Sequence, residues 1–187
     1  MSLPNIITLG RVILVPIIFW LLVTGHSQAA FYLVVVAGLS DAVDGFLAKR
    51  FGLETGLGAY LDPLADKLLI VSVYVALGVS KALPLWLVVA VVSRDILIVA
   101  AVLISGVFGQ PLQMKPLTIS KINTVAQIVL AATVLAAEGF SLQIDAIRIT
   151  LVWITGTLTV LSLAIYLKTW LRHMAGYEPG ASDGTNV

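Results

Sequence analysis

Four aspartates and three small residues occur at fixed spacing between Asp41 and Asp66, in the frame Asp-x2-Asp-Gly-x2-Ala-Lys-x8-Gly-x3-Asp-x3-Asp. The chain around them is strongly apolar, with 59% hydrophobic and 11% charged residues and a mean hydropathy of +1.05. A charged side chain in the middle of a membrane helix costs about 2.5–3.5 kcal/mol on insertion scales. Retaining four carboxylates in such a chain therefore predicts that they bind something cationic.

The spacing places each aspartate pair on one face of a helix. Asp41 and Asp44 share a face with the small residues that follow them, and Asp62 and Asp66 share a face on the next apolar segment. The short connection, Lys49 to Gly56, predicts that the two segments are antiparallel neighbours. The four carboxylates are then expected to converge near one membrane surface.

Divalent metal ions are the simplest way to neutralise this cluster. Asp95 adds a fifth acid to the apolar segments, which hold only two bases, Lys67 and Arg94. Mg²⁺ prefers carboxylate oxygens, and two such ions would clamp an attacking and a leaving oxygen. The alternatives are a buried salt-bridge network, a divalent-cation transporter and, more distantly, an intramembrane prenyl transferase.

Apolar segments of membrane-spanning length predict an all-α integral membrane protein with six transmembrane helices. They cover residues 6–24, 29–48, 57–79, 85–105, 119–137 and 146–170. The side that carries the amino terminus collects most of the loop Lys and Arg, and the other side has only Lys81 and Arg148, which predicts that both termini are cytoplasmic. Trp20 and Trp86 lie near predicted outer ends and Trp170 near an inner end, where indole rings are favoured, although ordinary packing would also explain them.

We expect one transmembrane domain, residues 1–172, and a polar, disordered tail, residues 173–187. The first helix has neither the basic start nor the small-residue cleavage site of a signal peptide, and we expect it to be retained. The absence of cysteine excludes disulfides and thiolate chemistry. The net charge of +1 gives no basis for binding nucleic acid.

The frame from Asp41 to Asp66 resembles the signature of the CDP-alcohol phosphotransferase family. It matches the four aspartates, both glycines and the alanine, whereas Lys49 stands where the family usually has arginine. Lysine keeps the charge but loses the planar two-pronged contact with a phosphate. The resemblance implies transfer of a phosphatidyl group from CDP-diacylglycerol to an alcohol, with release of CMP. With the topology, it implies an enzyme of the bacterial inner (cytoplasmic) membrane with its active site near the cytoplasmic face, and commonly a homodimer.

The resemblance also implies roles for individual residues. Asp41, Asp44, Asp62 and Asp66 correspond to ligands of two divalent cations, Mg²⁺ or Mn²⁺, and Asp66 also to the base that takes the proton of the attacking alcohol. A second group corresponds to the residues that bind CDP-diacylglycerol: Asn5, Thr8, Gly45, Ala48, Lys49, Thr55 and Gly58. Helix capping by Asn5 and an ordinary loop position for Thr55 remain open.

The acceptor is predicted from Arg94, Lys121 and Lys115. The stretches around them resemble cardiolipin synthases of this family and, more distantly, phosphatidylglycerophosphate synthases. No Lys or Arg occurs between Ile96 and Met114, whereas a pocket for the glycerol 3-phosphate dianion should supply several cations. The sequence therefore favours phosphatidylglycerol as acceptor, with phosphatidylglycerophosphate synthase as the alternative. A structural pair of Arg94 with its neighbouring acid and a headgroup contact for Lys121 are the other interpretations of these two residues.

Overall fold

The computed structural model describes residues 3–51, 58–107 and 118–174, with side chains described over residues 9–40, 67–100 and 118–171. This part of the chain forms six helices and confirms the predicted all-α fold. They are α1 (Leu3–Val23), α2 (Ser27–Phe51), α3 (Gly58–Val79), α4 (Leu85–Val107), α5 (Thr118–Phe140) and α6 (Asp145–Met174). Each helix overlaps one predicted apolar segment, so the positions of the six helices along the sequence were also predicted correctly.

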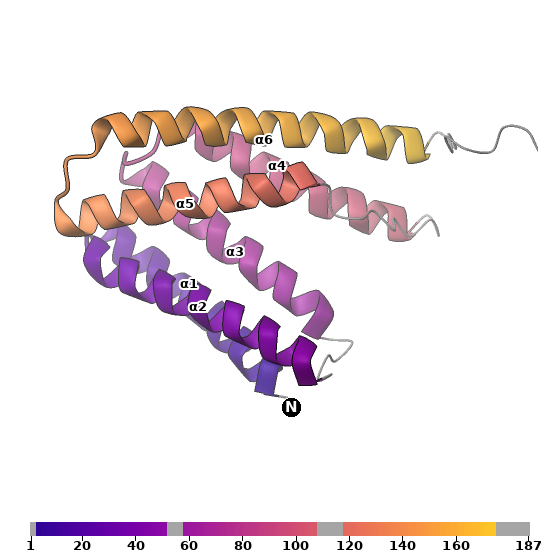
Figure 1. The fold of residues 1–187 in the computed structure, drawn as a ribbon, viewed down its shortest axis with the longest axis horizontal. Coiled ribbons are helices and arrows are strands. Elements are labelled where there is room, and N and C mark those ends of the chain that lie inside the picture. The colour runs from indigo at the N-terminus through magenta and orange to yellow at the C-terminus, as the bar shows by residue number, and fades with distance from the viewer. Residues whose placement is uncertain (1–2, 52–57, 108–117, 175–187) are drawn as a thin grey trace, which may run out of the picture.

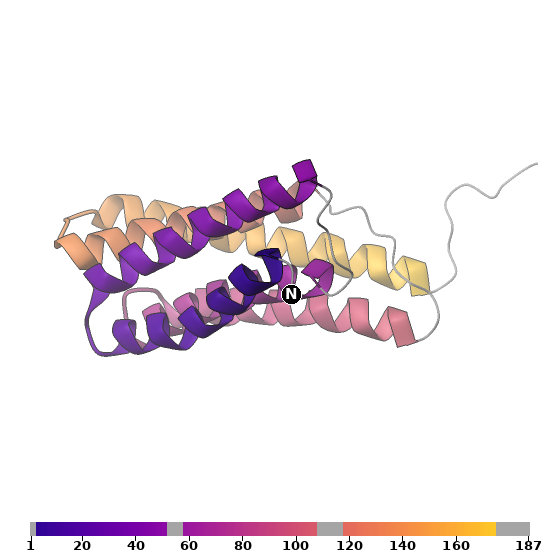
Figure 2. The ribbon, with the colours of Figure 1, turned by 90° about the horizontal axis from the view of Figure 1, so that it is seen from below.

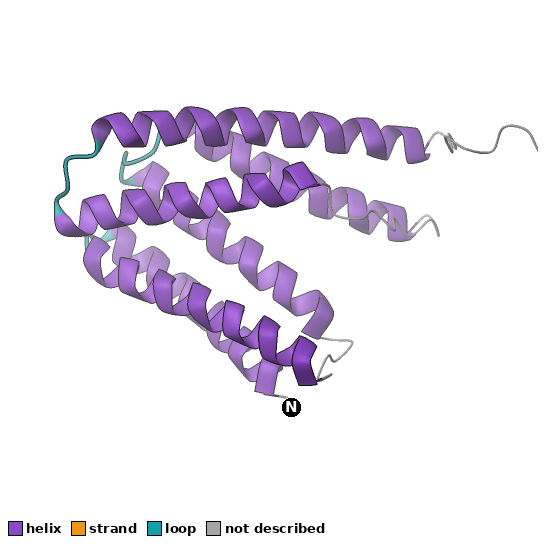
Figure 3. Cartoon of the chain, in the orientation of Figure 1, coloured by secondary structure: helices purple, strands orange, loops and turns teal. Residues whose placement is uncertain are grey.

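The helices run alternately in opposite directions, so that the chain forms an up-and-down bundle (Figure 1). The short turns α1–α2, α3–α4 and α5–α6 lie together at one end, on the left of Figure 3. Each of these turns contains a residue in the left-handed region, namely Gly25 (φ 82°), Lys81 (φ 63°) and Ser141 (φ 54°). That conformation ends a helix by turning the chain away from its axis. The opposite end holds the start of α1, the end of α2 and the start of α3.

Two groups of three helices make up the bundle. In the first group α1 packs against both α2 and α3, and in the second α6 packs against both α4 and α5. Contacts of α2 with α5, and of α3 with α4 and α5, join the groups (Figure 2). The prediction that α2 and α3 are neighbours needs correction, because they run in opposite directions but have no mutual contacts in the described part of the chain. α1 contacts both instead, and its Ile18 and Leu22 are buried in the apolar core.

Besides the apolar core, several polar side chains are buried and many large apolar side chains are exposed, unlike in a soluble bundle. Exposed apolar side chains occur on all six helices, for example Trp20, Leu39, Leu68, Val89, Val125 and Trp153. Buried polar side chains include Arg94, Asp95, Asn123, Gln127, Thr159 and Ser162. Two described segments, residues 118–140 and 145–171, are long and apolar enough to cross a membrane. These features support membrane association, while six spans and cytoplasmic termini stay predictions.

Candidate active site

The aspartate signature is divided between the end of α2 and the start of α3. Asp41 and Asp44 lie in the last turns of α2, and Asp62 and Asp66 lie in the first turns of α3. Spacings of three and four residues put the members of each pair on one helix face. Both helix ends lie at the same end of the bundle, on the right in Figure 1. The backbone therefore brings both pairs to one end, while these four side chains lie outside the described ones.

The residues predicted to bind CDP-diacylglycerol belong to the same end of the bundle. They are Asn5 and Thr8 in the first turns of α1, Gly45, Ala48 and Lys49 near the end of α2, and Gly58 at the start of α3. Their side chains are not among the described ones, and Thr55 and Lys115 lie outside the described residues altogether. Three helices thus bring these positions to the end that carries the aspartates.

Immediately after the signature, Lys67 joins a buried charged cluster with Arg94 and Asp95. One oxygen of Asp95, Oδ1, accepts hydrogen bonds from Lys67 Nζ at 3.0 Å and from Arg94 Nη1 at 2.5 Å. Arg94 is 1% exposed, whereas the Lys67 side chain is 28% exposed. Two cations share one carboxylate, so these three residues carry a net positive charge beside the aspartate-rich start of α3. An anionic group of a substrate would be attracted to this cluster.

The Arg94 guanidinium also links three helices of the second group. Its Nη2 donates hydrogen bonds to Ser120 Oγ on α5 and, at 3.0 Å, to Ser162 Oγ on α6. Its Nε is buried and has no hydrogen-bond partner among the described residues. A buried donor without a partner is uncommon and costs about 1–3 kcal/mol. Arg94 thus has the structural pairing that the sequence left open, and Nε is its one side-chain nitrogen without a partner among the described residues.

A polar seam between α5 and α6 continues from this cluster into the bundle. Thr159 Oγ1 donates to Asn123 Oδ1 at 3.0 Å, and Tyr74 of α3 donates to the backbone oxygen of Gln127 at 3.0 Å. The side-chain nitrogens of Asn123 and Gln127 are buried without partners in the described part of the protein. Sequence reasoning missed this seam, although a signal was present as polar residues at helical spacing: Ser120, Asn123 and Gln127 on α5, and Thr155, Thr159 and Ser162 on α6.

The predicted acceptor residues differ in their surroundings. Lys121 follows Ser120 in α5 but is exposed, and it forms no ion pair with another described residue. Arg94 is enclosed by α4, α5 and α6, as its hydrogen bonds demonstrate. Among the described side chains, no group of three or more His, Cys, Asp or Glu would hold a metal ion. The predicted metal site therefore depends on the four signature aspartates.

Comparison with known proteins gives a consistent set of relatives. The profile of the CDP-alcohol phosphatidyltransferase family matches residues 1–163. The chain is 34% identical to the chloroplastic CDP-diacylglycerol–glycerol-3-phosphate 3-phosphatidyltransferase 1 of rice, with 89% of this chain and 56% of that protein aligned. It is 33% identical to human cardiolipin synthase (CMP-forming), over 81% of this chain and 56% of the human protein.

A bacterial relative is matched over most of its length. The CDP-diacylglycerol–glycerol-3-phosphate 3-phosphatidyltransferase of Shigella flexneri is 33% identical, with 89% of this chain and 93% of that protein aligned. By contrast, the chain spans about half the length of the rice and human proteins. Relatives named for two different reactions therefore match at similar identity.

Proposed function

The chain belongs to the CDP-alcohol phosphatidyltransferase family, and we propose that it transfers the phosphatidyl group of CDP-diacylglycerol to phosphatidylglycerol, giving cardiolipin and CMP. The family supports a role in phospholipid biosynthesis. The observation that carries the choice of acceptor is the small excess of positive charge in the Lys67–Asp95–Arg94 cluster, where two cations share one carboxylate. A single phosphodiester charge suits that excess better than the dianion of glycerol 3-phosphate.

The family is generally dependent on divalent cations. The arrangement of the backbone supports two such ions, because α2 and α3 each bring a pair of aspartates on one face to the same end of the bundle. We assign Asp41, Asp44, Asp62 and Asp66 as the ligands of two Mg²⁺ or Mn²⁺ ions. When bound, such ions would neutralise charge on the transferred phosphate and on the departing CMP.

Asp66 is assigned as the general base. Its carboxylate takes the proton of the acceptor hydroxyl, and the hydroxyl oxygen then bonds to the phosphorus of the lipid-linked phosphate. The bond from that phosphorus to the oxygen of CMP breaks, so CMP leaves with the bonding electron pair. Lys49 would offset negative charge on the pyrophosphate during this displacement.

Small side chains near the ends of two helices suit a nucleotide that approaches the backbone closely. Gly45 and Ala48 at the end of α2, and Gly58 at the start of α3, are assigned to the CDP moiety. Asn5 and Thr8 would hydrogen-bond the cytosine or its ribose, and Thr55 would complete the donor site.

We assign Arg94, Lys121 and Lys115 to the acceptor. Arg94 would offer its unpartnered Nε to a phosphodiester oxygen of the acceptor lipid. The exposed ammonium of Lys121 would attract an anionic headgroup, and Lys115 is assigned to the acceptor from its position in the sequence alone. Exposed apolar side chains on α4 and α5, such as Ile96, Leu97, Ile122 and Val125, support entry of a lipid acceptor from the bilayer.

The proposed enzyme spans a membrane with all six helices and has both termini in the cytoplasm. Exposed apolar side chains on every helix support this arrangement, and the distribution of loop Lys and Arg supports the orientation. We propose the bacterial inner membrane as its location, the cytoplasmic face as the side of the active site, and a homodimer as the assembly. Residues 1–172 form the proposed transmembrane domain and residues 173–187 the polar tail.

One observation favours phosphatidylglycerophosphate synthase as the second candidate. The Shigella flexneri relative, which is named for glycerol 3-phosphate, is aligned over 93% of its length. The two candidates share the donor and the chemistry and differ only in the acceptor.

An assay of the purified protein separates these candidates. The protein is incubated with CDP-diacylglycerol, Mg²⁺ or Mn²⁺, and either phosphatidylglycerol or glycerol 3-phosphate. We expect CMP release and cardiolipin with phosphatidylglycerol. Product from glycerol 3-phosphate alone would establish the second candidate instead. No CMP release with any alcohol would contradict both, and metal flux into liposomes would then test the divalent-cation transporter.

A further inference from the structure

The two basic residues that the charge distribution leaves on the non-cytoplasmic side line the same pocket. Lys81 comes from the α3–α4 turn and Arg148 from the start of α6, and both line a pocket of about 370 Å³. Its lining residues come from the α3–α4 turn and the first turns of α4 and α6, which lie on the left of Figure 1, at the end of the bundle opposite the candidate active site. No other Lys or Arg occurs in the predicted loops of this side, so its entire basic charge gathers at one place.

Lys81 keeps an unfavourable backbone conformation at this position. Its φ of 63° lies in the left-handed region, where glycine is usual and other residues cost about 1 kcal/mol or more. Its backbone N–H donates to the oxygen of Gly78 at 3.1 Å, as in a helix C-cap. Glycine would satisfy this turn with less strain, so the turn itself does not require the lysine side chain.

Arg148 is half-buried and has donors to spare. Its Nη2 donates to Asp145 Oδ1 at 2.8 Å, within a pair whose acid is 77% exposed. Arg148 also borders a neighbouring hollow that contains Asp145 and Glu138. No hydrogen bond is found for its other nitrogens among the described residues. Lys81 and Arg148 are the charged residues that line this pocket, whereas Asp145 and Glu138 line the neighbouring hollow.

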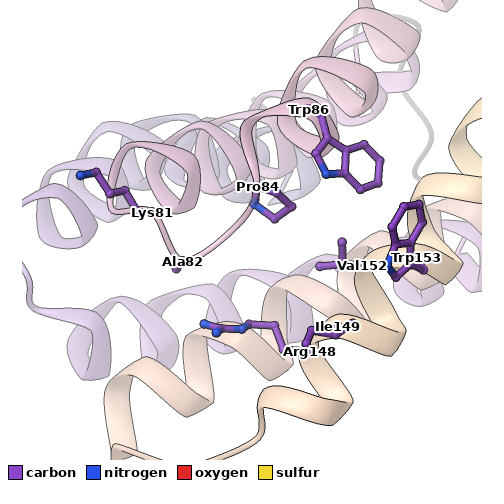
Figure 4. Close-up of a pocket in the computed structure, with 8 residues that line it drawn as sticks. All are labelled: Lys81, Ala82, Pro84, Trp86, Arg148, Ile149, Val152 and Trp153. Carbon is purple, nitrogen blue, oxygen red and sulfur yellow. The ribbon is translucent and has the colours of Figure 1, made fainter.

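The other end of the pocket is aromatic and apolar. Trp86 and Trp153 face each other there, with ring centroids 5.5 Å apart, and Lys81 and Arg148 lie at the opposite end (Figure 4). Gly156 makes room for this pair, because a Cβ there would lie 2.6 Å from Cη2 of Trp86. Both indoles are strongly exposed, at 46% and 63%, as in an aromatic belt at a membrane–water interface.

We propose that this pocket binds the headgroup of an anionic phospholipid in the leaflet opposite the candidate active site. Lys81 and Arg148 would contact the phosphate, and the first part of an acyl chain would lie along Trp86 and Trp153. A soluble anion would use only the basic end, whereas a phospholipid matches both ends of the pocket. The site is separate from the proposed catalytic residues and does not depend on which acceptor they use.

Quenching of tryptophan fluorescence by brominated phospholipids tests this proposal. Bromine on the acyl chains quenches a tryptophan that it contacts. The chain has four tryptophans, and Trp20→Phe with Trp170→Phe leaves only the pair in the pocket. This variant in phosphatidylcholine nanodiscs is titrated with brominated phosphatidylserine, an anionic lipid that is not the proposed acceptor. We expect saturable quenching at lower lipid fractions than with brominated phosphatidylcholine.

Two substitutions remove the basic end without straining the fold. Lys81→Gly suits the left-handed turn, and Arg148→Gln keeps a polar side chain of similar length. Each should weaken binding of phosphatidylserine about fivefold, as expected for one basic residue near a membrane surface. Lys168→Gln, an exposed change at the other end of α6, is the matched control and should leave binding unchanged.

Three outcomes would overturn the proposal. The first is equal quenching by the two brominated lipids, and the second is unchanged binding of phosphatidylserine after both pocket substitutions. The third is displacement of the lipid by inorganic phosphate at a similar concentration, which would identify a site for soluble anions. Because fluorescence is measured without turnover, none of these results depends on the proposed enzymatic function.

Discussion

The first three helices and the last three bury different kinds of side chain. Among the described residues of α1–α3, the buried side chains are apolar or aromatic except for Arg11. Those of α4–α6 include Arg94, Asp95, Asn123 and Gln127, joined by hydroxyl groups of α6. The first group nevertheless carries the aspartate signature at its helix ends. One group thus combines an apolar core with a polar end, and the other has polar groups through its interior.

This difference suggests a division of labour within the proposed enzyme. The donor nucleotide and the chemistry are assigned to residues near the start of α1, the end of α2 and the start of α3, at one end of the first group. The acceptor region depends on side chains from three helices that are held together by hydrogen bonds. Changes in the first group should therefore affect turnover more than folding, and changes in the second should affect folding as well.

The largest expected effect is that of Asp66→Asn on turnover. Removal of the proposed base and metal ligand should lower kcat by about 10²–10⁴-fold, because the acceptor hydroxyl keeps its proton. CMP release at saturating substrate measures the loss, and the protein should remain folded in detergent. Asp145→Asn, at the other end of the bundle and 77% exposed in its side chain, is the control. Retention of most activity by Asp66→Asn would remove this residue from the mechanism.

Asp95→Asn tests whether the buried charges stabilise the second group, and it should lower the stability of the protein. The substitution keeps the shape but leaves Arg94 and Lys67 without their shared carboxylate. Breaking a buried ion pair in this way costs about 3–5 kcal/mol, which should lower the Tm in detergent strongly.

A double variant separates charge from shape in that cluster. Arg94→Gln with Asp95→Asn removes both buried charges and should recover much of the lost stability, because no uncompensated charge remains buried at the pair. A Tm for Asp95→Asn equal to that of the unchanged protein would show that the cluster does not hold α4–α6 together.

The fold was predictable because the length and hydropathy of the apolar segments determine where the six helices begin and end. The position of both aspartate pairs at one end of the bundle was also predictable, since Asp41 to Asp66 are close in sequence and their spacing matches a helix. The pairing of Arg94 with the neighbouring Asp95 was among the interpretations of the sequence. Its serine partners were not predictable, because Ser162 lies 68 residues away on a helix whose sequence has no motif. The short connection after α2 fixed the direction of α3 but not its neighbours, which depend on how α1 packs.

Gly139→Ala tests the joint between the two groups. A Cβ at Gly139, near the end of α5, would lie 2.9 Å from the Cα of Gln28 at the start of α2. Backbone atoms cannot rotate away, so α2 and α5 must separate, at a cost of about 1–3 kcal/mol. Gly38→Ala in α2 is the matched control, because its Cβ would meet nothing within 4 Å and alanine favours a helix. Thermal unfolding in detergent should separate the two variants, and equal Tm values would argue against this close contact.

Lys121→Gln should have the smallest effect, and it tests whether Lys121 belongs to the acceptor site. Lys121 is exposed on α5 beside Ser120, whose hydroxyl accepts a hydrogen bond from Arg94. An exposed charge contributes about 0.2–1 kcal/mol to an ionic contact, so KM for phosphatidylglycerol should rise up to about fivefold, with kcat unchanged. Lys168→Gln is exposed on α6 and provides the control for a general loss of surface charge. An equal change of KM in both variants would assign Lys121 to the bilayer surface, and the acceptor site would then depend on the buried Arg94 cluster.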